Sequence, residues 1–171
     1  MVWFNKASDL HASAGALWMS MREDYSDIFA AELGFASQFN MSVAVWPVYM
    51  MLCGLSLELL YKAISVAKGE EVKPIHDLIQ LANLAGIKTE GQSKKLLALL
   101  TESIIWEGKY PAPKDKRRES FSTANNLYNQ VMYTKCQHKG IERQKPTDAL
   151  SWNSFNKLWV KASKIFWENR S

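Results

Sequence analysis

The longest helical pattern in the chain lies between Trp46 and Ile64. Apolar side chains recur there at alternating steps of four and three residues: Trp46, Met50, Cys53, Leu57, Leu60 and Ile64. This spacing places them on one face of an α-helix. We expect this helix to be the core of the protein and the other elements to pack against it.

The N-terminal part of the sequence predicts one or two helices before this core helix. Ser8 or Asp9 can cap the first of them, because a short side-chain oxygen accepts hydrogen bonds from unpaired first-turn amides. The alanine-rich residues 28–35 continue the helical pattern. Ser42 is the expected cap before the core helix, and Pro47 lies within its first turns, where a missing amide costs least.

Three further helices are predicted after the core helix. A short one ends at Gly86, and the next begins near Thr89 and Gln92, which have the spacing of a capping box. The final helix starts behind Thr147 or Asp148 and carries a clear apolar stripe.

Residues 112–146 show only a weak pattern, and we predict an irregular basic insertion there. The alternative is one more amphipathic helix with Phe121, Ala124, Tyr128 and Val131 on its apolar face, although the asparagines at 125, 126 and 129 lower its helix propensity. No segment of the chain alternates apolar and polar residues for long enough to predict a strand. The expected fold is therefore all-α: an up-and-down bundle of four to five helices in a single domain, residues 1–171, with the insertion before the last helix.

Composition agrees with one domain in a reducing cytoplasm. A chain of 171 residues with 47% hydrophobic residues can bury a continuous core. Its two cysteines, Cys53 and Cys136, are expected to be free thiols. The start lacks the order of a signal peptide, and the apolar run Val43–Leu55 is shorter than the ~20 residues that cross a bilayer. We expect no membrane span.

Positive charge is concentrated near the C-terminal third of the chain. The segment from Lys109 to Lys145 holds nine basic and three acidic residues, so its net charge is +6. The rest of the chain has a net charge of −2, which gives the total of +4. Such a segment attracts phosphate-bearing ligands. The alternative is a solvated loop whose lysines keep it soluble.

Two short motifs are candidate ligand sites. His76-Asp77 combines an imidazole with a carboxylate, which can move a proton or hold a ligand. The alternative is that both residues serve the start of a helix. Lys109-Tyr110 places a cation beside an aromatic ring and next to Pro111, which suits a phosphate and a base; the alternative is an ordinary helix end.

A third candidate is Glu58 with Lys62, four residues apart on the core helix, the spacing of an ion pair. The alternative places them on the solvent-exposed face of that helix. We expect no metal site and no cofactor, since there is no glycine-rich phosphate loop and no paired Cys or His spacing. The three histidines, His11, His76 and His138, lie far apart in the sequence.

Three motifs, taken in order, resemble the HEPN (higher eukaryote and prokaryote nucleotide-binding) domain family. They are Leu57-Glu58-Leu59-Leu60-Tyr61-Lys62-Ala63, then His76-Asp77-Leu78, then Trp106-Glu107-Gly108-Lys109-Tyr110-Pro111. The resemblance covers residues 43–113 and implies an all-α bundle. The closing helix around Trp152 fits the family's last helix.

The resemblance implies one of two activities. Many members are dimeric, metal-independent ribonucleases in which an Arg and a His roughly four to six residues later do the chemistry. No His follows Arg22, Arg117, Arg118 or Arg143 at that spacing. Members without this pair are thought to bind nucleotides or partners and often carry an Arg-Tyr-Pro motif, whose place is taken here by Lys109-Tyr110-Pro111. Lys keeps the charge of Arg but loses its planar fork.

The resulting hypothesis is a non-catalytic HEPN-like domain that binds nucleotide or RNA phosphate, as a homodimer or with a partner protein, in bacterial defence or a toxin–antitoxin pair. The expected groove is lined by Glu58, Lys62, His76, Asp77, Trp106, Lys109 and Tyr110, and a basic patch by Lys114, Lys116, Arg117 and Arg118. The alternatives are a ribonuclease with an altered catalytic pair, His76 or His138 acting with Arg117 or Arg118, and a dimerisation module.

Overall fold

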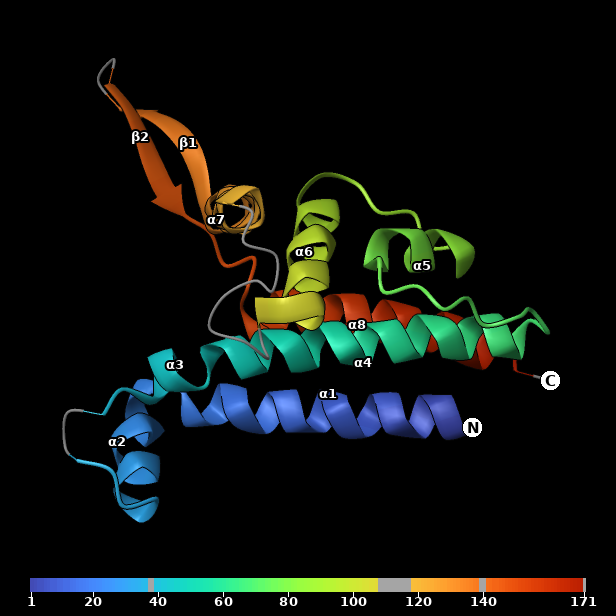
Figure 1. Ribbon diagram of the computed structural model, residues 1–171, viewed down its shortest axis with the longest axis horizontal. Coiled ribbons are helices and arrows are strands. Elements are labelled where there is room, and N and C mark those ends of the chain that lie inside the picture. The colour runs from blue at the N-terminus through green and yellow to red at the C-terminus, as the bar shows by residue number, and fades with distance from the viewer. Residues whose placement is uncertain (37–38, 108–117, 139–140, 171) are drawn as a thin grey trace.

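The computed structural model describes residues 1–36, 39–107, 118–138 and 141–170 (Figure 1). Its elements follow in this order: α1 (Val2–Ser20), α2 (Glu23–Glu32), α3 (Met41–Ala44), α4 (Trp46–Ala67), α5 (Leu78–Leu84), α6 (Gly91–Glu102), the π-helical turn η1 (Ser103–Glu107), α7 (Arg118–Met132), β1 (Tyr133–His138), β2 (Ile141–Pro146) and α8 (Trp152–Glu168).

Three long helices, α1, α4 and α8, lie lengthwise, and α6 stands across them (Figure 1). The short α5 packs between α4 and α6, and α2 and the β1–β2 hairpin project in opposite directions. The predicted helical fold is thus confirmed in outline. The up-and-down order is not confirmed, because α6 crosses the long helices.

The core helix predicted from the spacing of apolar residues is α4. Met50, Cys53, Leu57, Leu60 and Ile64 on its predicted face are all between 0 and 4% exposed. By length and composition α4 is also apolar enough to cross a membrane, and within the described residues it is the one helix that is. However, 67% of its most apolar window is buried by other parts of the protein. Its apolar character is therefore explained by its place in the core.

Helix α1 begins at Val2, so the predicted start at Ser8 or Asp9 is wrong. The helix has no side-chain cap at Met1. Instead, tertiary packing extends it: the Phe4 ring stacks on Phe166 of α8 with ring centroids 4.3 Å apart, and Ala7 is fully buried. Burial of this first turn stabilises helical geometry that capping preferences alone do not predict.

Several helix starts differ from the predicted ones by a few residues. The core helix α4 has no side-chain cap at Val45, so the predicted cap Ser42 is wrong. A short helix, α3, precedes it and is capped by Asn40, whose side chain accepts from the Ser42 and Val43 amides. The capping box of α6 uses Glu90 and Ser93 rather than Thr89 and Gln92. Several neighbouring polar residues can serve as a cap, so the sequence pattern alone does not determine which of them does.

At the start of α8 the cap is Ser151, which accepts from the Ser154 amide, so the prediction of Thr147 or Asp148 is wrong. Thr147 is engaged elsewhere: its hydroxyl donates to the Val131 carbonyl at 2.6 Å. The predicted end of α5 at Gly86 is confirmed. Gly86 has φ +80°, and the next amide, that of Ile87, donates to the Ala82 carbonyl at 2.8 Å.

The described part of 112–146 is regular, so the predicted irregular insertion is wrong there. It forms α7 and an antiparallel hairpin in which Lys135 lies opposite Gln144 and Thr134 opposite Lys145. The expectation of no strands is wrong for the same segment. Most described hairpin side chains are exposed, so the alternation that signals a half-buried strand is missing, and backbone pairing holds the strands together.

Gly54 allows α6 and η1 to approach α4 closely. A Cβ atom at Gly54 would lie 2.7 Å from Cγ1 of Ile104 and 2.9 Å from the Leu100 carbonyl oxygen. Real Cβ atoms do not approach other atoms so closely, and a backbone carbonyl cannot rotate aside as a side chain can. The crossing of α4 by the C-terminal end of α6 therefore requires glycine at this position.

His11 joins α1 to α8 through its ring. The ring stacks on Trp159 with centroids 4.3 Å apart, and Nε2 donates to Oδ1 of Asn156 at 2.9 Å. Burial lowers the pKa of His11, although the hydrogen bond to Asn156 partly opposes this shift. The neutral imidazole is thus the form that the folded protein favours.

We predict that the protein loses stability as the pH falls below the ordinary histidine pKa. The unfolded chain binds a proton at His11 near its usual pKa of about 6.5, whereas the folded protein binds it only at lower pH. The contribution of His11 is therefore fully present above that value and is lost as the pH falls through the folded pKa. Thermal unfolding between about pH 7.5 and about pH 5.5 measures the effect.

The matched control is His11→Phe, which retains an aromatic ring against Trp159 but does not titrate. Its melting temperature should fall less between the same two pH values than that of the parent protein. Equal falls in both proteins would show that His11 contributes nothing to the acid sensitivity.

Candidate functional site

Helix α4 places Glu58 and Lys62 one turn apart, and both side chains are buried. The Lys62 ammonium lies 2.7 Å from Oε1 of Glu58, and the two side chains are only 8% and 5% exposed. The predicted ion pair is confirmed. The alternative interpretation, that these residues mark a solvent-exposed face, is wrong, because that face is covered by elements distant in sequence.

His76 is the third member of what we call the Glu58 cluster: Glu58, Lys62 and His76. Its Nδ1 lies 3.0 Å from Oε1 and 3.1 Å from Oε2 of Glu58. A carboxylate can only accept, so Nδ1–H donates and the ring lone pair is left on Nε2. The His76 side chain is 62% exposed. The cluster therefore combines a buried ion pair with an imidazole that reaches solvent.

Asp77 is not part of this cluster. Its carboxylate caps α5, accepting from the Ile79 amide at 2.8 Å and the Gln80 amide at 3.0 Å. For Asp77 the helix-start alternative is confirmed, whereas His76 points to Glu58. The start of α5 is also tied to α6, since the Leu78 amide donates to the Thr101 hydroxyl at 3.1 Å.

The other predicted site residues have side chains outside the described part of the structure. Trp106 belongs to η1 and Arg118 begins α7, but neither side chain is described. The remaining predicted site residues all fall in the range 108–117, outside the described residues: Lys109, Tyr110, Lys114, Lys116 and Arg117. The meeting of His76 with Lys109 and Tyr110 stays a prediction.

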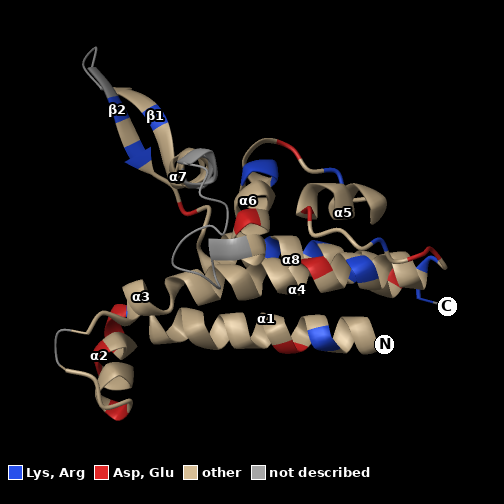
Figure 2. Cartoon of the chain, viewed as in Figure 1, with Lys and Arg blue, Asp and Glu red and all other residues tan. Residues whose placement is uncertain are grey.

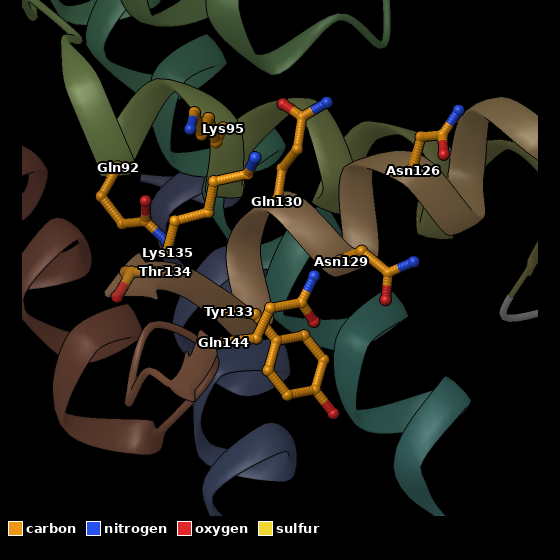
Figure 3. Close-up of a pocket in the computed structure, with 9 residues that line it drawn as sticks. All are labelled: Gln92, Lys95, Asn126, Asn129, Gln130, Tyr133, Thr134, Lys135 and Gln144. Atoms are coloured by element: carbon orange, nitrogen blue, oxygen red, sulfur yellow. The ribbon is translucent and has the colours of Figure 1, made fainter. Parts of the chain in front are cut away.

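A second candidate site was not predicted: a pocket of about 480 Å³ between α6, α7 and the hairpin, here called the polar pocket (Figure 3). Five carboxamides line it: Gln92, Asn126, Asn129, Gln130 and Gln144. The remaining lining residues are Lys95, Tyr133, Thr134 and Lys135. The pocket thus combines amides, two ammonium groups and one phenol ring.

Among the described residues that line the polar pocket, two are lysines and none is Asp or Glu. Figure 3 shows the Lys135 side chain extended toward Lys95 and Gln130, while the Tyr133 ring points away from both lysines. Strand register explains part of this arrangement: Lys135 lies opposite Gln144, and side chains two apart, such as Tyr133 and Lys135, share a face.

A signal for this pocket was present in the sequence. Asn126, Asn129 and Gln130 recur at steps of three and one, which places them on one face of a helix, and Tyr133 follows directly after that helix. Asparagine also lowers helix propensity, so the same residues weaken the helical pattern of this segment. The other lining residues come from α6 and β2, which lie far from α7 in the sequence. Only the packing of these elements brings them to the same pocket, and the sequence pattern did not predict that packing.

Other reactive groups belong to the core. Cys53 is a free, buried thiol, and burial raises its pKa, although a hydrogen bond with Tyr49 opposes the shift. Burial also raises the pKa of Tyr61. Both groups therefore stay protonated. The second cysteine, Cys136, is a free thiol exposed on β1. Within the described ranges, no group of three His, Cys, Asp or Glu side chains is arranged to hold a metal ion.

Neither a family model, nor a curated protein, nor a solved structure matches this chain. The similarity to HEPN domains thus remains a prediction based on its sequence motifs. The two candidate sites are interpreted below from their own chemistry.

We predict that Glu58→Leu destabilises the protein by about 3–5 kcal/mol, because it leaves the Lys62 ammonium buried without a partner. The double variant Glu58→Leu with Lys62→Met should recover most of that loss, since two apolar side chains can replace a buried ion pair. Urea denaturation, with the unfolding free energy extrapolated to water, measures both.

His76→Ala is the matched control, because its side chain is mostly exposed and its loss leaves the buried ion pair intact. Its unfolding free energy should fall much less than that of Glu58→Leu. A double variant as unstable as Glu58→Leu alone would contradict the role assigned to the ion pair.

Proposed function

We propose that this chain is a HEPN-like helical domain that binds a nucleotide, or a nucleotide unit of single-stranded RNA, through its phosphate and its base. The observation that carries the proposal is the polar pocket. Its volume lies within the range of about 300–1,000 Å³ typical of small-ligand sites. The sequence motifs support the resemblance to HEPN domains, and the residues that line the pocket support the class of ligand.

Electrostatics favour a phosphate ligand. Lys95 and Lys135 bring two lysine side chains to the pocket, and the described residues that line it include no Asp or Glu. Further cations lie on the same hairpin, Arg143 and Lys145 on β2 (Figure 2). Ammonium groups close to one another attract phosphate and release its counterions on binding.

The amides and the ring favour a base. Each carboxamide offers both a donor and an acceptor, the combination needed to hydrogen-bond the edge of a nucleobase. Within the described part of the chain, the Asn126, Asn129 and Gln130 side chains have no hydrogen-bond partner in the protein. The Tyr133 ring, 38% exposed, is an aromatic surface on which a base can stack.

The Glu58 cluster is less suited to hold phosphate. Glu58 neutralises Lys62 at 2.7 Å, and both side chains are almost completely buried. A ligand would reach His76 first. If Lys109 and Tyr110 meet His76 as the resemblance predicts, they would supply the exposed cation and ring that the described part of this groove lacks.

The homodimer and the setting in bacterial defence or a toxin–antitoxin pair remain predictions. Helix α2 supports an interaction with another protein chain, since it projects from the long helices and exposes Ile28, Phe29 and Leu33 by 58%, 41% and 61% (Figure 1). Contiguous apolar side chains on a surface mark interaction sites.

A second candidate function, metal-independent RNA cleavage, is favoured by one observation: the Glu58–His76 hydrogen bond. A carboxylate that holds Nδ1–H orients the imidazole and leaves Nε2 as a base in solvent, the arrangement of a general base. In RNA, that base would take the 2′-hydroxyl proton, the 2′-oxygen would attack the adjacent phosphorus, and the 5′-oxygen would leave with a proton from water.

For the binding function, we predict that Lys95→Gln weakens binding of a labelled RNA oligonucleotide about fivefold at about 0.1 M salt. Each phosphate contact contributes a slope of about −0.7 to the dependence of log affinity on log salt for a single strand. Fluorescence anisotropy over a salt titration should show both the lower affinity and a slope less steep by about 0.7.

Lys94→Gln is the matched control, because Lys94 is the exposed neighbour on α6 and does not line the pocket. It should keep nearly the parent affinity. Lys109→Ala and Tyr110→Ala belong in the same titration: unchanged affinity in both would exclude them from the site. Equal weakening by Lys94→Gln and Lys95→Gln would indicate nonspecific charge attraction and contradict the pocket.

For the second candidate, we predict that RNA incubated with the protein in a chelator yields fragments ending in 2′,3′-cyclic phosphate, and that His76→Ala abolishes them. The imidazole is required because no other described group in the cluster can serve as a base at neutral pH: Glu58 and Lys62 are buried in an ion pair. Gel electrophoresis and mass spectrometry of the fragments provide the measurement.

His138→Ala is run beside it, with the melting temperature of each variant recorded. Cleavage lost only in His138→Ala would transfer the role to His138. RNA that stays intact with the parent protein would remove the enzymatic candidate and leave the binding function standing.

A further inference from the structure

Helix α2 and the segment that follows it form a pocket of about 300 Å³, here called the α2 pocket. Its described lining consists of Asp27, Ala30 and Ala31 from α2, together with Phe35 and Ala36 from the following segment. Three alanines and a phenylalanine make this lining apolar, and the Asp27 carboxylate is the one charged group among the described residues. Such a lining suits a cation carried on an apolar stem.

The end of α2 places Phe35 at the pocket. Gly34 has φ +78°, and the amide of Phe35 donates to the Ala30 carbonyl at 2.9 Å, so the chain turns back at the end of the helix. The Phe35 ring stacks on Phe39, with centroids 3.9 Å apart and planes at 7° to each other. These contacts hold an aromatic ring beside a carboxylate.

The chain supplies no described cation to this carboxylate. Asp27 is exposed, and no ion pair in the described part of the structure involves it. Residues 23–61 contain no Lys, Arg or His, and α2 alone carries four acidic residues: Glu23, Asp24, Asp27 and Glu32 (Figure 2). This part of the chain is therefore acidic in a protein of net charge +4, and it attracts a positively charged partner.

The start of α2 shows how this helix holds a guanidinium group. Cζ of Arg22 lies 5.5 Å from the centroid of the Tyr25 ring, and its Nη2 lies 3.4 Å from Oδ2 of Asp24. A carboxylate and an aromatic ring thus contact the same arginine. Asp27 and Phe35 offer the same two kinds of group to a cation from another molecule.

Arginine fits this pair of groups better than lysine does. Its planar guanidinium pairs with a carboxylate and stacks on an aromatic ring, whereas the ammonium of lysine acts as a point charge. A protein chain fits better than a free amine, because only Ala30 among the ten residues of α2 is buried. A small cation would leave Ile28, Phe29 and Leu33 exposed, whereas a protein chain can cover them.

From these observations we propose that the α2 pocket receives an arginine side chain of a partner protein, with the guanidinium paired to Asp27 and stacked on the Phe35 ring. The proposal rests on the interaction of α2 with another protein chain, a part of the proposed function, and adds the chemistry of that partner. It is independent of nucleotide binding, because the α2 pocket and the polar pocket share no described lining residue.

The test titrates pentapeptides of the form Leu-Ser-X-Ser-Leu, acetylated and amidated, into the isotope-labelled full chain, with Arg, Lys or citrulline at X. Citrulline is the matched control, because it has the shape of arginine without its charge. Chemical shifts of the Asp27, Ala31 and Phe35 amides report binding. We expect the arginine peptide to bind about fivefold more tightly than the citrulline peptide, since an exposed ion pair and a cation–π contact are each modest. The lysine peptide should lie between them.

Variants of the protein assign the contacts. Asp27→Asn should reduce the affinity for the arginine peptide to that for the citrulline peptide. Phe35→Leu retains an apolar side chain but removes the ring, so it should weaken the arginine peptide about threefold and remove its advantage over the lysine peptide. Glu32→Gln is the matched control, because Glu32 is an exposed acid on the same helix that does not line the pocket. Melting temperatures confirm that each variant is folded.

Two further measurements separate the sources of the arginine. Acetyl-arginine amide should bind more weakly than the pentapeptide; equal affinity would assign the pocket to a small organic cation and overturn the partner protein. In sedimentation, a dimer that Asp27→Asn converts to a monomer would identify a second copy of this chain as the occupant, which also overturns it.

Equal binding of the arginine and citrulline peptides, or equal losses in Asp27→Asn and Glu32→Gln, would overturn the arginine site itself. The RNA titration with Lys95→Gln uses the other pocket. Its result therefore stands or falls separately from that of the peptides.

Discussion

At Gly54 the backbone of α6 comes close enough to α4 that no side chain fits between them. A Cβ there would meet the Leu100 carbonyl oxygen at 2.9 Å. This contact fixes where the C-terminal end of α6 lies, and the rigid helix then determines the position of both of its ends. Near the crossing, the Thr101 hydroxyl accepts a hydrogen bond from the amide of Leu78, two residues after His76. At the other end, Gln92 and Lys95 line the polar pocket. Both candidate sites depend on one helix crossing.

The two sites use charge in opposite ways. In the Glu58 cluster the charges lie out of water, where an ion pair is tolerated only because its partners are 2.7 Å apart. The opposite charges of such a pair cancel at a distance, so the pair attracts a charged ligand only weakly. In the polar pocket the two lysines are exposed to solvent, and the described lining adds no Asp or Glu. Figure 2 shows acidic residues on α2 and basic residues on the hairpin.

Prediction from the sequence succeeded where local periodicity and burial agree. In α8 the predicted stripe of Phe155, Trp159, Ala162 and Phe166 is between 0 and 7% exposed. It failed where local signals are weak. The start of α1 is stabilised by Phe4 against Phe166, and the hairpin is held by backbone pairing between largely exposed strands. Neither interaction leaves a periodic trace in the sequence.

The sequence by itself determined the helical core and the spacing of Glu58 with Lys62, because a helix of this periodicity has one apolar face and brings residues four apart together. Only the tertiary structure decided that this ion pair is buried, that His76 and not Asp77 joins it, and that amides of α7 face lysines of α6 and β1. Those relations join residues distant in the chain. They follow from how the helices cross, which depends on the contacts of all the elements together and not on the pattern within any one of them.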